Sequence, residues 1–249
     1  VGTVQSGKLG TLGYFIEDTY NLAEQGVELI VWPEGALHTD PQVELTAEIQ
    51  ALARESGAYL VTGVAIKTSQ GLRNEAWVIS PQGQFLGVYG KDHPLTLMGE
   101  TSLTRGTYPV YQTSLGGLGT IICFDLEFND TARKLALGGA QILGVPSNDW
   151  PALAERQVAY AIFRAVENRV ALVKGDTFYD SLVIDARGNL LASLKSEQGI
   201  RGELAASVPL GTADAPYSRL GDLVGWISLV GMVSLMVVNP LVLRRMRKQ

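Results

Sequence analysis

The sequence has 249 residues, with 20 lysines and arginines against 25 aspartates and glutamates, one cysteine and two histidines. A single cysteine excludes an internal disulfide framework, and with only two histidines beside it the chain falls short of an ordinary structural zinc site. A net charge of −5 argues against a general nucleic-acid binder, and 46% hydrophobic residues exclude a disordered chain.

The first part of the chain alternates between strand and helix patterns. Strands are expected at 1–5, 27–32 and 58–66, and helical stretches separate them at 12–25 and 43–56. Strands separated by helix-length segments are typical of βαβ units. The pattern therefore predicts an α/β layered domain.

Hairpins and further helices are expected in the rest of the domain. Segments 75–90 and 181–195 each contain two strand-like runs around a glycine-containing turn, as hairpins do. Between them the pattern predicts a buried strand at 117–125, a helix at 128–140, a strand at 141–147 and a long helix at 153–170. Asn129 or Asp130 is expected to cap the first of these helices.

The C-terminal end has a different character. Residues 223–243 contain no charged side chain, and about 20 apolar residues are enough to span a bilayer as a helix. Four of the last six residues are basic, so the chain before Arg244 carries a balance of −9. The positive-inside rule then predicts a transmembrane helix with a cytoplasmic C-terminus and a periplasmic domain; a buried core helix is the alternative.

The N-terminal end shows neither an initiator methionine nor a signal peptide, and Val1 already lies in the first predicted strand. A domain on the outer side of a membrane needs an upstream segment to export it. We therefore expect the natural chain to continue N-terminally with a further membrane region.

Three side chains with complementary chemistry follow predicted strands. Glu34 comes after ELIVWP, Lys91 after FLGVYG, and Cys123 ends GTIIC. A thiol with its usual pKa of about 8.5 is mostly protonated at neutral pH, so a cysteine nucleophile needs a base such as a carboxylate. A lysine stabilises the negative charge that develops in acyl transfer. Taken singly, each residue also fits a plain structural or surface role.

The segments around these residues resemble the signatures of a known superfamily. WPEGA (32–36), YGKDH (89–93) and ICFDLEF (122–128) are similar to the three motifs of the nitrilase, or carbon–nitrogen hydrolase, superfamily. The resemblance implies a nitrilase-type αββα sandwich with Glu34 as general base, Lys91 as oxyanion stabiliser and Cys123 as nucleophile. It also implies supporting roles for Glu100, for Asp125 and for the backbone N–H of Phe124, and no metal or cofactor.

Further segments resemble the apolipoprotein N-acyltransferase branch of that superfamily: PSNDW (146–150), RAVENR (164–169) and APYSRLGD (215–222). This resemblance implies that Cys123 takes a fatty acyl chain from a phospholipid donor as a thioester. The acyl chain then passes to the N-terminal amine of a diacylglyceryl-lipoprotein acceptor at the bacterial inner membrane. The expected organisation is a catalytic domain at 1–210, a juxtamembrane linker at 211–222, a transmembrane helix at 223–243 and a basic cytoplasmic tail at 244–249.

Other interpretations stay open. A membrane-anchored hydrolase of a small amide fits the short stretch between Glu100 and Cys123 and the aspartate at position 125, where the acyltransferases tend to carry glutamate. A protease-like dyad of Cys123 with His38 or His93 is a second alternative. A third is an inactive scaffold, which would be expected to lack one of Glu34, Lys91 and Cys123. Four residues beside the motifs are candidates for either packing or substrate binding: Trp32, Tyr89, Asn148 and Trp150.

Overall fold

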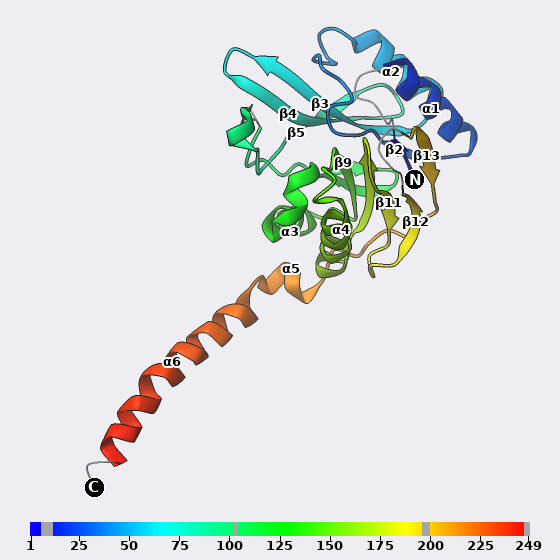
Figure 1. Ribbon diagram of the computed structural model, residues 1–249. Coiled ribbons are helices and arrows are strands. Elements are labelled where there is room, and N and C mark those ends of the chain that lie inside the picture. Colours follow the sequence, from blue (N-terminus) through cyan, green and yellow to red (C-terminus); the bar gives the residue numbers. More distant parts are fainter. Residues whose placement is uncertain (6–11, 102–103, 196–199, 247–249) are drawn as a thin grey trace.

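The structure, a computed structural model, describes residues 1–5, 12–101, 104–195 and 200–246, with side chains described as far as Met236. Two β-sheets lie face to face, and helices cover their outer faces (Figure 1). α1 (Leu12–Glu24) and α2 (Thr46–Ser56) cover the first sheet, and α3 (Asn129–Leu137) and α4 (Ala154–Asn168) cover the second. The predicted αββα sandwich is confirmed.

The two sheets have similar strand arrangements. The first runs in the order β13 (Gly202–Ala205), β1 (Gly2–Gln5), β2 (Leu29–Val31), β3 (Tyr59–Thr68), β4 (Gly71–Ile79), β5 (Phe85–Gly90), with β6 (Glu100–Thr101) beside β4. The second runs β12 (Leu190–Leu194), β11 (Ser181–Ile184), β10 (Ala171–Asp176), β9 (Ile142–Ser147), β8 (Gly116–Thr120), β7 (Tyr111–Thr113). Each contains three parallel strands continued by an antiparallel hairpin, β1–β2–β3 with β4–β5 and β8–β9–β10 with β11–β12.

Alternation along the strands builds two cores. Val31 and Val61 face the second sheet, whereas Ile30 packs beneath α1 and α2, because successive strand residues point to opposite faces. Gly144 of β9 meets the two valines across the sheets. A Cβ there would lie 3.1 Å from Val61 and 3.3 Å from Val31, so the sheets approach closely at this point.

Two local predictions were wrong, and one strand was not predicted. The strand expected at 117–125 ends at Thr120, and Cys123 instead begins a 3₁₀ turn, η2 (Cys123–Glu127). Phe128, not Asn129 or Asp130, is the N-cap residue of α3. Strand β10 was not anticipated, because its sequence ALVKGD ends in charged residues that are rare inside a buried strand.

The segment predicted as a linker packs onto the domain. α5 (Pro216–Leu220) lies against α3 and α4, and both Ala215 and Ser218 are buried. The Ser218 hydroxyl donates to Asn168 Oδ1 over 3.2 Å. Residues 215–220 are therefore part of the folded body. The predicted domain boundary at residue 210 stays a prediction.

Helix α6 (Leu223–Met246) leaves the body of the molecule and points away from it (Figure 1). The large apolar side chains described on it are exposed, and they are Leu223, Val224, Trp226, Ile227, Leu229, Val230, Met232, Val233, Leu235 and Met236. Over the described side chains, no helix meets the length and apolarity needed to cross a membrane. The last seven residues of the predicted span 223–243 and the tail 244–249 lie outside the described side chains.

Candidate active site

Five strand exits meet at one edge of the sandwich. Glu34 follows β2, Lys91 follows β5, and Cys123 follows β8 by a short loop. The backbone carbonyl of Ser147, at the end of β9, accepts hydrogen bonds from the N–H of Glu34 (3.3 Å) and from that of Thr177 beyond β10 (3.2 Å). These bonds tie the exits of the two sheets together, so residues far apart in the sequence share one site.

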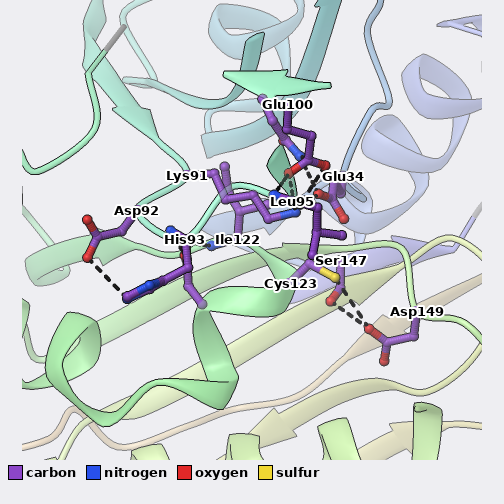
Figure 2. A network of polar contacts seen from close by, with 12 residues as sticks. Glu34, Lys91, Asp92, His93, Leu95, Glu100, Ile122, Cys123, Ser147 and Asp149 are labelled. Carbon is purple, nitrogen blue, oxygen red and sulfur yellow. Dashed lines mark hydrogen bonds and ion pairs between the residues drawn. The ribbon is translucent and has the colours of Figure 1, made fainter. Parts of the chain in front are cut away.

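Lys91 is the centre of a buried ionic cluster. Its ammonium lies 2.9 Å from Glu34 Oε1 and 3.1 Å from Glu100 Oε2, and the side chain is 1% exposed (Figure 2). Asn74 of β4 donates from Nδ2 to Glu34 Oε1 over 2.5 Å and to Glu100 Oε1 over 3.0 Å. Asn74, which the sequence did not single out, therefore fixes both carboxylates around the lysine.

The pKa of Lys91 reflects this environment. Burial by itself lowers the pKa of the ammonium, but the negative charges of Glu34 and Glu100 outweigh burial and raise the pKa of Lys91 above its usual value, and Cys123 adds to this effect when it is ionised. Lys91 is consequently a permanent cation at physiological pH. A fixed positive charge in a buried site is suited to holding a developing oxyanion.

Asp125 shapes the turn that presents Cys123. Its carboxylate accepts hydrogen bonds from Tyr89 Oη (2.7 Å) and from the backbone N–H groups of Ile122 (2.9 Å) and His93 (2.8 Å). These three bonds join β5, the lysine loop and η2 at one buried point. Asp125 therefore supports the geometry of the site from behind, and Tyr89 is engaged in the same network.

Cys123 adopts a left-handed backbone conformation, with φ at 43°. This conformation is uncommon outside glycine and is often found where a side chain has to be presented from a sharp turn. Phe124 follows as the second residue of η2, where backbone N–H groups have no acceptor within the helix. That N–H is suited to hold an anionic oxygen beside the sulfur.

On its other side, Cys123 contacts residues that the sequence did not predict. The thiol donates to Asp149 Oδ1 over 3.7 Å. Asp149 Oδ2 lies 2.9 Å from the ammonium of Lys174, which is also 2.9 Å from Asp176 Oδ2. Asp149 belongs to the PSNDW motif, but Lys174 and Asp176 lie on the unanticipated strand β10, and only their pairing with Asp149 links them to the site.

Burial raises the pKa of the Cys123 thiol well above its usual value. The negative charges of Glu34 and Asp149 raise it further, against the opposing effects of Lys91 and a hydrogen bond from the backbone of Asn148. The thiol is therefore protonated at rest. A reaction at this sulfur requires a base to remove its proton.

The site opens into a pocket of about 740 Å³. Glu34, Lys91, Glu100 and Cys123 lie in its wall together with Phe124, Asn148, Trp150, His38 and several aliphatic side chains. Trp150 is exposed at the opening, as is Met98. The pocket thus combines a small group of ionic side chains with a largely apolar lining. This combination suits a substrate with a hydrocarbon part.

The four candidates for substrate contact divide into two groups. Asn148 and Trp150 line the pocket. Trp32 is fully buried beneath α1, where it stacks on Phe15 at 5.0 Å and donates to Thr19, and Tyr89 is fully buried against Asp125. The structure therefore places Trp32 and Tyr89 in packing and positioning roles.

The two histidines lie in different places. His38 is exposed at the mouth of the pocket. His93 stacks on Phe128 with ring centroids 3.6 Å apart, and its Nε2 lies 3.3 Å from Asp130 Oδ1. These contacts hold the His93 ring beside α3, whereas the carboxylate that accepts a hydrogen bond from the thiol is that of Asp149.

One cluster among the described residues offers ligand atoms for a metal ion, namely Asp92, His93 and Asp130. Other groups already occupy these carboxylates. Tyr108 and Thr131 donate to Asp92, and Lys134 lies 2.6 Å from Asp130 and 3.9 Å from Asp92. Because a lysine ammonium already supplies positive charge there, the cluster is satisfied without a metal ion.

Gly63 sets the position of Glu34. A Cβ at Gly63 would lie 2.2 Å from the carbonyl oxygen of Pro33 and 2.7 Å from the Cα of Glu34. We expect Gly63→Ala to push the Glu34 loop away, lower the stability by about 1–3 kcal/mol and reduce turnover at least tenfold. Thermal unfolding and initial rates measure both effects.

Gly13→Ala is the matched control for this substitution. Gly13 lies on the exposed face of α1, and a Cβ there meets no atom within 4 Å. Alanine is a better helix former than glycine by about 0.5–1 kcal/mol, so this variant should be as stable as the parent or slightly more stable. Equal activities for the two variants would show that the close approach of Gly63 to the Glu34 loop does not determine the position of Glu34.

The sequence and the fold are similar to those of known proteins. The carbon–nitrogen hydrolase family model matches residues 8–214. Apolipoprotein N-acyltransferase from Geobacter metallireducens is 29% identical over an aligned length of 249. The alignment covers 88% of this chain and 46% of that protein. Nitrilase from Pyrococcus abyssi is 32% identical over 193 residues, which cover 70% of this chain and 72% of that protein.

A solved structure has the same fold. The amidase from Nesterenkonia sp. AN1, in a form that carries the product of Michael addition of acrylamide at its active-site cysteine, superposes with a TM-score of 0.72. It is 21% identical and covers 84% of this chain and 92% of its own. The present chain spans about half the length of the acyltransferase relatives that it matches.

Proposed function

Because the chain belongs to the carbon–nitrogen hydrolase family, we propose that it works as an N-acyltransferase on lipid substrates. In this proposal Cys123 takes a fatty acyl group from a phospholipid and passes it to the N-terminal amine of a diacylglyceryl lipoprotein. The extent of the alignment carries the proposal, since the acyltransferase relative covers 88% of this chain and the nitrilase relative 70%. The apolar pocket walls support it.

The first half-reaction forms a thioester. Lys91 and Asn74 both donate to Glu34 Oε1, so Oε2 is the oxygen that we assign to accept the Cys123 proton. The sulfur then attacks the ester carbonyl, and Lys91 with the Phe124 N–H holds the resulting oxyanion. Glu34 returns its proton to the departing lysophospholipid hydroxyl as the tetrahedral intermediate collapses.

The second half-reaction reverses these steps with a different nucleophile. Glu34 takes a proton from the acceptor amine, whose nitrogen attacks the thioester carbonyl. The same two donors hold the oxyanion, and the sulfur leaves as the thiol when Glu34 returns the proton. The products are an amide and the regenerated Cys123, so the proton balance closes over the cycle.

Location at a membrane is part of the proposal. The exposed apolar side chains of α6, which projects from the body, suit a lipid environment better than water. We propose that residues 223–243 anchor the domain with the tail 244–249 in the cytoplasm and the pocket on the periplasmic side of the bacterial inner membrane. An anchored pocket would meet two lipid substrates in the same bilayer.

Intact-mass spectrometry tests the proposed thioester. The full chain in detergent is incubated with a phospholipid of defined acyl chains, with Cys123→Ala as the control. We expect a mass increase equal to one acyl group that survives until an N-terminal diacylglyceryl-cysteine peptide is added, and then disappears as the peptide gains the acyl group. Rapid hydrolysis of a small amide, with no acyl adduct from phospholipid, would support an amidase of the same family instead.

A further inference from the structure

The Cys123 sulfur lies between two ionic clusters. Figure 2 shows it with Glu34 and Lys91 on one side and with Ser147 and Asp149 on the other. The hydrogen bond recorded for the thiol goes to Asp149 Oδ1 at 3.7 Å, within the ordinary reach of a sulfur donor. At rest, the proton on sulfur therefore points away from the carboxylate that the proposed mechanism uses as a base.

Asp149 is held rigidly in this position. It is 3% exposed, the hydroxyl of Ser147 donates to Oδ1 over 3.1 Å, and its own backbone N–H donates to Asp176 Oδ2 over 3.2 Å. The Lys174 ammonium, which is fully buried, lies between Asp149 and Asp176 and also donates to the carbonyl of Asp180 over 2.7 Å. A carboxylate fixed by these partners has little freedom to turn from the sulfur.

The charge balance around the thiol is unfavourable to an anion. Asp149 and Asp176 share the single cation Lys174, and Glu34 and Glu100 share the single cation Lys91. With all of these groups ionised, each cluster carries one net negative charge, so a thiolate between them faces repulsion from both sides. The groups that face the thiol or act through these clusters are Glu34, Lys91, Glu100, Asp149, Lys174, Asp176 and Asp180.

We propose that Asp149, anchored by Lys174, is a positioning residue that keeps the Cys123 thiol protonated and turned from Glu34 until substrate fills the pocket. When substrate binds, the S–H rotates from Asp149 to Glu34, and the proton leaves only as the sulfur attacks the carbonyl. Asp149 thereby protects the nucleophile from oxidation and from reagents that need a free thiolate. The inference rests on the proposed function in taking Cys123 as the nucleophile and Glu34 as its base.

The titration of the cluster supports this inference. Burial, together with the charge of Asp176, raises the pKa of Asp149 to about 6 against the opposing charge of Lys174. Asp149 is therefore ionised at neutral pH and is an effective acceptor for the thiol. Its negative charge in turn raises the pKa of Cys123.

Alkylation of the full chain by iodoacetamide tests the inference without any substrate. Cys123 is the only cysteine, so intact mass reports its modification directly. The rate is measured against pH for the parent and for Asp149→Asn, in which the amide oxygen still accepts from the thiol but the charge is absent. We expect the midpoint of the Asp149→Asn profile to fall by about one pH unit, with roughly tenfold faster alkylation below the midpoint.

Lys174→Met is expected to shift the alkylation midpoint in the opposite direction. Without its cation, the cluster gains negative charge, and the alkylation midpoint should rise above that of the parent. A purely structural loosening of the site would instead expose the thiol and accelerate alkylation in both variants. Asp176→Asn keeps Lys174 in place, and for it we expect a smaller fall in midpoint than for Asp149→Asn, so the test stands even where Lys174→Met does not fold.

Glu48→Gln on the exposed face of α2 is the control for a general change in net charge, and its midpoint should match that of the parent. An Asp149→Asn midpoint equal to or above the parent value would overturn the inference. That outcome is distinct from failure of the proposed function, which would show as the absence of an acyl thioester in an enzyme with normal alkylation behaviour.

Discussion

Replacing Cys123 by alanine is expected to abolish turnover, with a fall on the order of 10⁴–10⁶-fold, because no other described side chain in the pocket is a comparable nucleophile. Glu34, Lys91 and the Phe124 N–H would remain in place but would have no sulfur to activate. Intact mass should show no acyl adduct after incubation with phospholipid. Initial rates with a defined acyl donor and amine acceptor measure the loss.

The same variant should fold normally. Cys123 is partly exposed at the start of η2, and the three hydrogen bonds to Asp125 that shape this turn do not involve the sulfur. Cysteine and alanine experience the same left-handed backbone at this position, so the substitution adds no new strain. Circular dichroism and the melting temperature provide the control. Retained turnover in a folded Cys123→Ala protein would exclude Cys123 as the nucleophile.

Replacing Lys91 by methionine is expected to damage both activity and stability. The substitution removes the cation between Glu34 and Glu100 and leaves two carboxylates uncompensated in a buried site, at a cost of about 3–5 kcal/mol. Since the pKa of Lys91 is raised in the folded state, its contribution to stability is fully present at neutral pH and is lost only as the pH rises above the usual lysine range. Turnover should fall at least a hundredfold with the loss of the oxyanion donor.

Urea unfolding and initial rates, compared with Lys195→Met, separate these effects. Lys195 is exposed just after β12, far along the chain from the lysine loop, and its replacement should change stability by less than about 0.5 kcal/mol. The double variant Lys91→Met with Glu100→Gln should recover part of the lost stability but not the activity. Full activity in the single variant would show that Lys91 has no part in the chemistry.

Much of the site could be predicted from the sequence, since its central residues belong to short local motifs. Glu34 and Lys91 directly follow strands whose apolar patterns are legible, and the structure places both at the predicted exits. Cys123 was placed at a strand end because GTIIC reads as one continuous apolar run. Hydrogen bonds from the backbone to Asp125 end that strand early and form a 3₁₀ turn, which no hydrophobic pattern reveals.

The other side of the site could not be read from the sequence. Lys174 lies 25 residues beyond Asp149, on a strand that local propensity does not favour, and its burial is tolerated only because two carboxylates neutralise it. Asn74 was likewise hidden in the middle of a long strand. Contacts between residues so far apart depend on how the sheets pack.

By itself, the sequence determined the layered α/β class, the family and the identity of a glutamate, a lysine and a cysteine at strand exits, because these follow from local patterns of polarity and from short motifs. Only the tertiary structure decided which carboxylate the resting thiol meets, how Asn74 and Asp125 fix the site, and where Trp32 packs. Those features depend on close contacts between distant segments, and the free energies of burial and ion pairing set them only once both sheets have come together.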